Sequence, residues 1–334
     1  MNIAALFNDR HYRWFAWGAV VLVLLALPFI TEAVLGRSWV RIIAVSLLFV
    51  MLALGLNIVV GFAGLLDLGY IAFFAVGAYS YALLASPQFA VHWPFLLLLP
   101  LGAAIAAVFG ILLGAPTLRL RGDYLAIVTL GFGEIIRVFL NNLNRPVNIT
   151  NGPQGITLID PLQMGGFSLA QTHSFAGLTF SPVHNYYFVF LVCAALTIAL
   201  SLRLQNSRIG RAWVAIRDDE LAASAMGINT RNVKLLAFAM GATFGGVAGG
   251  LFASFQGFIS PESFQLIDSI MVLCMVVLGG MGSFLGAVIG GLIVGLTESF
   301  GGLYLGESLG QIGISLIFIL ILLFRPSGLF GDKQ

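Results

Sequence analysis

Residues 42–60 read IIAVSLLFVMLALGLNIVV, a run of nineteen residues that contains no charged side chain. A helix needs about 20 apolar residues to cross a bilayer, because its backbone polar groups must be paired within the segment. Apolar residues do not alternate with polar ones in this run, as they would in a strand of an outer-membrane barrel. The run therefore predicts a transmembrane helix.

The rest of the chain extends this pattern. The 334 residues are 59% hydrophobic and only 9% charged, and the mean hydropathy is +1.01. One soluble core would not need so many apolar side chains, so the sequence predicts an all-α, polytopic transmembrane bundle of about ten helices, with residues 1–334 as one domain. The apolar run at 14–35 is too long for the apolar part of a cleaved signal, so it is expected to be the first span. The predicted spans are 14–35, 42–60, 65–85, 94–115, 124–140, 186–202, 235–255, 266–280, 285–300 and 309–324.

Basic residues orient these spans. Cytoplasmic loops of membrane proteins are enriched in Lys and Arg, which indicates that both termini are cytoplasmic here. The residues placed inside are Arg10, Arg13, Arg119, Arg121, Arg203, Arg208, Arg211, Arg217, Arg231, Lys234, Arg325 and Lys333; those placed outside are Arg37, Arg41, Arg137 and Arg145.

A long polar segment at 141–185 divides the predicted spans into five and five. The second five then begin from the opposite side of the membrane, which is the arrangement of an inverted repeat with a permeation site between its halves. Ten unrelated helices would give the same count. The segment 141–185 is expected outside the cytoplasm, either as a functional cover or docking loop or as a plain connector.

Glycine is abundant, with 40 residues. Within the predicted spans it recurs at four-residue spacing, which favours close helix packing more than substrate contact. Two glycine clusters, at 61–69 and 279–283, lie at helix ends instead, where broken helices can line a cavity. These clusters give the candidate pathway or gating residues Asn57, Gly61, Gly64, Asp67, Gly69, Gly279, Gly280 and Gly282.

Charged residues inside spans are candidates for function, because they are costly in lipid. Glu134 and Arg137 are three residues apart on one predicted helix and can pair with each other, so they have either a structural or a pathway role. Asp67, Asp268 and Glu298 have no basic neighbour in the sequence. An ion-coupled transporter could use these three carboxylates, although interface positions would explain Asp67 and Asp268 without function.

Other classes of function find little support. A net charge of +2 does not indicate a nucleic-acid partner, and the four isolated histidines suggest no metal site. The only lysines are Lys234 and Lys333, and neither follows a glycine. A phosphate-binding Gly-Lys-Ser/Thr loop is therefore missing from this sequence, no cofactor is expected on this chain, and any ATP must be hydrolysed by another polypeptide.

Residues 210–229, GRAWVAIRDDELAASAMGIN, form a polar, helix-prone island within the predicted cytoplasmic loop 203–234. A chain with so few charges concentrates several of them here. The island is expected to be a docking surface, with a solvated loop as the alternative.

Four blocks of the sequence resemble one transporter family. They are 55–57 through 77–79, 119–124 through 134–137, 208–211 through 235–238, and the C-terminal RPSGLFG at 325–331. In this order they resemble permease subunits of high-affinity branched-chain amino acid ABC importers, specifically the larger of the two permease types. The similarity extends from the second span to the C-terminus.

The resemblance implies a multi-pass subunit of a bacterial inner-membrane assembly. Its partners would be a second homologous permease, two cytoplasmic ATP-binding subunits and a periplasmic solute-binding protein, within membrane lipid. The island would be the coupling loop to the ATPase, although Leu221 stands where many importers carry the first Glu of the motif. The implied coupling residues are Arg211, Arg217, Asp218, Asp219, Glu220, Ala222, Ala223 and Gly227.

The substrate rests on resemblance alone. A largely apolar pathway suits branched-chain amino acids, and similar permeases carry urea or short amides. A reading from another class is an ion-coupled secondary transporter or channel, which would leave the island without a partner.

Overall fold

The chain was described from a computed structural model covering residues 10–89, 91–118, 120, 122–164, 167–175, 178–304, 306–325 and 327–331. Its helices are α2 (Arg10–Leu35), α3 (Arg37–Leu56), η1 (Asn57–Phe62), α4 (Ile71–Leu84), α5 (Phe95–Thr117), α6 (Asp123–Asn142), η2 (Gly152–Gln154), α7 (Pro182–Gln205), α8 (Arg208–Asp218), α9 (Glu220–Ala225), α10 (Thr230–Gln256), η3 (Pro261–Ser263), α11 (Leu266–Gly279), α12 (Phe284–Tyr304) and α13 (Glu307–Phe324). Its short strands are β1 (Ala85–Ser86), β2 (Val91–His92), β3 (Ile156–Thr157), β4 (Gln163–Met164), β5 (Phe167–Ser168), β6 (His173–Phe175), β7 (Leu178–Phe180) and β8 (Phe258–Ile259).

Each predicted span overlaps one of these helices. Within the described ranges, six helical segments are long and apolar enough to cross a membrane by themselves: Arg37–Phe62, Phe95–Thr117, Pro182–Gln205, Thr230–Gln256, Pro261–Gly279 and Phe284–Gly302. The apolar parts of α2, α4 and α13 are shorter, and α6 belongs to neither group. The chain is therefore a multi-pass helical membrane protein, while the count of ten spans stays a prediction.

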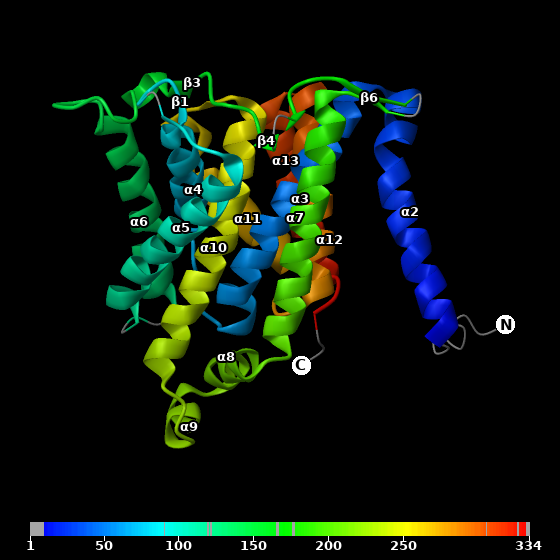
Figure 1. Cartoon of the computed structure of the whole chain (residues 1–334). Coiled ribbons are helices and arrows are strands. Elements are labelled where there is room, and N and C mark those ends of the chain that lie inside the picture. Colours follow the sequence, from blue (N-terminus) through cyan, green and yellow to red (C-terminus); the bar gives the residue numbers. More distant parts are fainter. Residues whose placement is uncertain are drawn as a thin grey trace.

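The helices stand side by side in one bundle, with α10 in contact with α3, α4 and α5, and α12 in contact with α3 and α11 (Figure 1). Helix α6 lies at one edge and α2 at the other. Glycine allows the central helices to approach closely. A β-carbon added at Gly77 of α4 would lie 2.2 Å from the carbonyl oxygen of Gly246 in α10. Packing in the bundle interior therefore depends on these small residues.

The predicted span 65–85 is wrong at its start, because helix α4 begins only at Ile71. Before it, α3 continues into η1, which is a π-helical turn, and Gly64 then takes a positive φ of 68° that stops the helix. Asp67 Oδ1 then accepts a hydrogen bond from the backbone N–H of Gly69 at 2.9 Å. This side-chain bond competes with helical pairing and keeps the chain extended between the two helices.

The polar segment predicted at 141–185 is shorter than expected, because α6 continues to Asn142 and α7 begins at Pro182. It crosses the end of the bundle opposite α8 (Figure 1). Strand β3 pairs antiparallel with β8, which precedes α11, and Tyr81 of α4 donates a hydrogen bond to the Asp160 carbonyl at 3.2 Å. The segment is thus bonded to both halves of the chain. His184 is fully buried in the first turn of α7.

The other end of the bundle carries α8 and α9, which project beyond the long helices (Figure 1). Leu329 and Phe330 also lie at this end, where their backbone N–H groups donate to the carbonyls of Leu278 and Gly279, both at 2.9 Å. We call this side the α8 end of the molecule.

Candidate coupling and translocation site

Helices α8 and α9 are fixed to the bundle by two buried contacts with α10. The indole of Trp213 is fully buried, and its Nε1–H donates to the carbonyl of Val233 at 2.8 Å. Lys234 Nζ lies 2.5 Å from Glu220 Oε1, and the lysine side chain is only 6% exposed. A paired lysine at this burial holds its partner tightly, because separation would leave a charge without compensation. The island is therefore a folded part of the protein, not a mobile loop.

The two short helices have clear sequence signals at their ends. Ser207 caps α8 by accepting a hydrogen bond from Gly210 N at 3.1 Å. Asp219 caps α9 by accepting from Leu221 N at 2.8 Å and from Ala222 N at 3.1 Å. Such caps satisfy backbone donors that helix geometry leaves unpaired. They explain why a break separates α8 from α9 at Asp219, so that α9 turns away from the bundle.

Helix α9 presents an apolar surface to the outside. Leu221 is 74% exposed and Met226 is 83% exposed, and Ala222 is also exposed. Ala223, by contrast, is 4% exposed and packs inward. Of the two alanines implied in coupling, Ala222 is open to a partner and Ala223 rests on its own chain. Gly227 has a positive φ of 86° with open space around it.

The charged residues of the island have several distinct surroundings. Glu220 binds Lys234, and Asp219 is a helix cap. Asp218 is mostly exposed and lies 3.7 Å from Arg217. Arg211 makes a local hydrogen bond to the Asn206 carbonyl at 3.2 Å. Glu220 and Asp219 therefore shape the island itself, which leaves Asp218 and Arg211 as exposed charges.

Arg217 connects the island to the first glycine cluster. Its Nη1 donates a hydrogen bond to the carbonyl of Gly61 at 2.7 Å. A β-carbon at Gly64 would lie 2.7 Å from Arg217 Cγ, and one at Gly282 would lie 2.7 Å from Nη1. Both glycines also have positive φ angles. The Arg217 side chain thus lies between the two glycine clusters. Any larger residue at Gly64 or Gly282 would occupy its space.

Asn57 joins the same two clusters. Its Oδ1 accepts from the backbone N–H of Gly282 at 3.0 Å, and its Nδ2 donates to the Ser283 carbonyl at 3.4 Å. Asn57 is 1% exposed and lies in the π-helical turn, a form frequent at functional sites. Gly279 and Gly280 pack beside them: a β-carbon at Gly279 would lie 2.0 Å from the Gly286 carbonyl, and one at Gly280 would lie 2.4 Å from Gly331 N. At the α8 end, the two clusters therefore form one junction.

Asp67 and Gly69 lie apart from this junction, against α6. A β-carbon at Gly69 would lie 2.0 Å from the carbonyl of Thr129, and the Thr129 hydroxyl accepts from Leu68 N at 2.9 Å. Asp67 is fully buried, and its Oδ2 has no hydrogen-bond partner among the described residues. The extended segment before α4 is thus fitted closely to α6.

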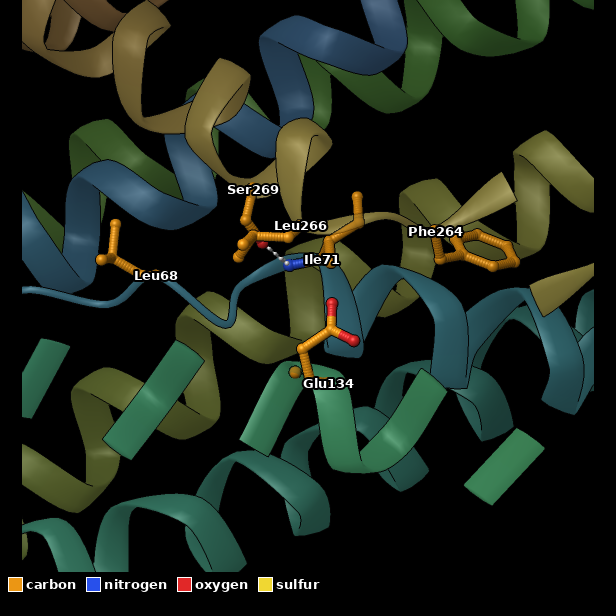
Figure 2. A pocket seen from close by; sticks show the side chains of 7 residues that line it. Leu68, Ile71, Glu134, Phe264, Leu266 and Ser269 are labelled. Atoms are coloured by element: carbon orange, nitrogen blue, oxygen red, sulfur yellow. Dashed lines mark hydrogen bonds between the residues drawn. The ribbon is translucent and has the colours of Figure 1, made fainter. Parts of the chain in front are cut away.

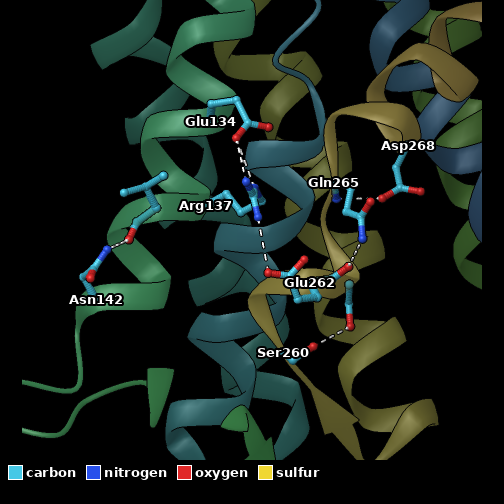
Figure 3. A network of polar contacts seen from close by, with 9 residues as sticks. Glu134, Arg137, Asn142, Ser260, Glu262, Gln265 and Asp268 are labelled. Carbon is cyan, nitrogen blue, oxygen red and sulfur yellow. Dashed lines mark hydrogen bonds and ion pairs between the residues drawn. The ribbon is translucent and has the colours of Figure 1, made fainter. Parts of the chain in front are cut away.

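Glu134 and Arg137 pair with each other, as their spacing predicts (Figure 3). Arg137 donates from Nε and Nη2 to Glu134 Oε2 at 3.1 and 3.0 Å, and its Nη1 reaches Glu262 Oε1 at 3.3 Å. The Glu262 contact links α6 to η3 of the second half. Glu134 also borders a crevice with Leu68 and Ser269, between the start of α4 and α11, that is too narrow to admit a water molecule (Figure 2).

Asp268 and Glu298 line a larger cavity, of about 370 Å³, together with residues of α3, α10 and η3. Asp268 Oδ2 accepts from Gln265 N at 2.8 Å in the cap of α11. Asp67 does not line this cavity. The three carboxylates proposed for ion coupling are therefore not gathered at one site.

Sequence reasoning missed several residues of this site. Lys234, Trp213 and Glu262 act through contacts with residues far along the chain, and Leu221 and Met226 are functional candidates only because α9 turns them outward. The isolated lysine inside an apolar chain was the one available signal, since a buried lysine requires an acidic partner.

A helical membrane bundle with two broken-helix clusters and an anchored helical loop defines this protein as a transport subunit. Residues 38–324 match the family described as branched-chain amino acid transport system / permease component. The chain belongs to this family.

Two related proteins of Escherichia coli K12 show how far the similarity extends. The high-affinity branched-chain amino acid transport system permease protein LivM is 41% identical over 93% of this chain and 73% of that protein. The permease protein LivH of the same named system is 29% identical over 86% of this chain and 92% of that protein. No solved structure matches the chain.

Proposed function

We infer that this chain is a permease subunit of an ATP-driven importer and translocates branched-chain amino acids. Family membership and the similarity to LivM support the substrate class. The observation that carries the coupling role is the island: it is anchored on α10, exposes the apolar surface of α9, and reaches the Gly61 break through Arg217. A solvated connector would need none of these three features.

The proposed partners follow from this division of tasks. One of two ATP-binding subunits would dock on the exposed Leu221, Ala222 and Met226. The pair would hydrolyse ATP, for which this chain carries no Gly-Lys-Ser/Thr loop. A second homologous permease would complete the pathway. A periplasmic binding protein would deliver the amino acid to the end opposite α8, which places the α8 end in the cytoplasm of a bacterial inner membrane.

The cytoplasmic termini and the inverted repeat are part of the same proposal. The start of α2 lies at the α8 end (Figure 1), as do Leu329 and Phe330. Packing supports a repeat of α2–α6 in α7 and α10–α13: α3 packs on α12 as α10 packs on α5, and α4 packs on α5 as α11 packs on α12. Equivalent pairs thus recur with the two halves exchanged.

The junction suggests how ATP drives transport. Closure of the ATPase pair would move α9 and α8 together with α10, and the Arg217 contact with the two glycine clusters would open. Substrate contributes to the switch only through different affinities for the outward-open and inward-open states. Urea or short amides are the alternative cargo. Ion coupling is less favoured, because Asp67 lies away from the cavity that holds Asp268 and Glu298.

The test is co-purification combined with reconstituted uptake. Met226→Glu places a charge on the proposed docking surface, where 83% exposure leaves folding undisturbed. We expect the variant to insert normally but to lose the ATPase subunits on gentle purification, and to lose ATP-dependent leucine uptake in proteoliposomes.

The matched control is Leu158→Glu, because Leu158 is 75% exposed at the opposite end of the molecule. This variant should retain the ATPase subunits. The coupling role is wrong if both variants retain the ATPase equally well, and the importer assignment is wrong if the wild-type chain alone catalyses full uptake.

A further inference from the structure

We propose that α6 is the helix against which the homologous permease packs, and that Glu134 and Arg137 line the pathway enclosed between the two chains. This rests on the proposed function and adds the position of the second permease.

The first argument is the position of the charges. Glu134 and Arg137 lie in the second half of a 20-residue helix. Their side chains are 35% and 29% exposed. Mutual pairing reduces their charge, yet each still presents polar atoms on the surface of a helix that the sequence predicts to span the membrane. Charged groups within a membrane span face protein or a water-filled space, because lipid offers no hydrogen bonds.

The second argument is how little of α6 its own chain covers. It lies at the edge of the bundle (Figure 1), and on the described residues it is not among the helices apolar enough to span a membrane alone. Its outer face still exposes large side chains: Tyr124, Ile127, Ile135 and Phe139 are 73%, 64%, 65% and 57% exposed. A helix with an apolar outer face and a charged margin suits a protein interface beside an aqueous path.

Other exposed helices differ. On α7, Val192 and Leu196 are 63% and 57% exposed, and on α13, Ile312 and Leu316 are 61% and 58% exposed. Charged residues do not accompany these four side chains in the described middle turns of either helix. Such faces suit lipid.

The occupant is a homologous chain, not an unrelated protein. This sequence is similar to two permease proteins that carry the name of one transport system in one organism, LivM and LivH. Related folds pair most simply about a twofold axis, which brings the same surface of each chain together. A surface with both an acidic and a basic side chain is complementary to itself under that operation.

The crevice beside Glu134 connects this interface to the helix breaks (Figure 2). Leu68 comes from the extended segment before α4, and Ser269 comes from α11 and accepts a hydrogen bond from Ile71 N at 3.0 Å. Movement of either half would therefore widen or close the crevice at the side of the pathway.

Site-specific photo-cross-linking in the assembled complex tests the interface. We would place benzoylphenylalanine at Ile127 or Ile135, with Leu196 and Leu316 as similarly exposed controls, and identify adducts by mass spectrometry. We expect an adduct with the second permease from both α6 positions and none from the controls. Adducts from the controls alone, adducts with a second copy of this chain, or lipid adducts from α6 would overturn the proposal. If no second permease co-purifies, the proposed function fails as well.

Cysteine labelling tests the aqueous pathway separately. Leu130 lies four residues before Glu134, on the same face of α6, and is half-buried. In a background with Cys193 and Cys274 replaced by alanine, we expect Leu130→Cys to react at least about tenfold faster than Leu196→Cys with a membrane-impermeant thiosulfonate. Equal rates would show that Glu134 and Arg137 do not line water.

Discussion

Replacing Arg217 by alanine should make the transporter leak. The Arg217 guanidinium donates a 2.7 Å hydrogen bond to the Gly61 carbonyl and fills the space beside Gly64 and Gly282. A hydrogen bond from a charged donor contributes about 1.5–3 kcal/mol. Because 37% of the Arg217 side chain is exposed, the lower end of that range applies. Each 1.4 kcal/mol is a factor of ten in an equilibrium constant, so the junction should open about tenfold more often.

The assay is efflux of radiolabelled leucine from proteoliposomes that contain the whole complex without ATP. Arg211→Ala is the matched control, because Arg211 lies on the same helix and, among the described residues, bonds to the Asn206 carbonyl at its own end of the loop. We expect about tenfold faster efflux from Arg217→Ala and wild-type efflux from Arg211→Ala. Both variants should retain the ATPase subunits. Equal, low efflux from the two variants would refute the idea that Arg217 holds the junction closed.

Two further changes address the bundle and the island. Gly77→Ala should lower the thermal midpoint by several degrees, because its β-carbon would meet the Gly246 carbonyl at 2.2 Å and overpacking costs about 1–3 kcal/mol. Gly18→Ala, in α2 with open space around it, should not lower the midpoint, and a similar loss at both sites would contradict the packing argument. Lys234→Met should leave the chain inserted but abolish stimulation of the ATPase by substrate, because Glu220 loses its ammonium partner and α9 shifts. Normal stimulation would show that this ion pair does not position α9.

The sequence predicts the positions of the long helices well, because runs such as 42–60 contain more consecutive apolar residues than a helix of a soluble protein has. It also predicts the Glu134–Arg137 pair, since residues three apart meet on one face of a helix. It fails at the start of α4, where Asp67 forms a local bond to Gly69 within an otherwise apolar stretch.

Contacts between residues far apart in the chain could not be predicted from the sequence. Arg217 and Gly61 are 156 positions apart, and no local pattern shows that they meet. The inward orientation of Ala223 depends on how α9 rests on α10, which the Lys234–Glu220 pair decides. Each glycine cluster can be recognised in the sequence. That Asn57 joins them by a hydrogen bond is seen only in the folded structure.

The contacts of α8 differ in strength in a way that determines where movement occurs. Toward α10, the helix is held by a fully buried tryptophan, and the neighbouring α9 by a lysine that is only 6% exposed. Toward the Gly61 break, it is held by one part-exposed arginine whose neighbours are glycines. A force applied to α9 therefore displaces α10 together with the island, and the Arg217 contact breaks first. Because α10 belongs to the second half and Gly61 to the first, the docked ATPase would move one half of the chain against the other.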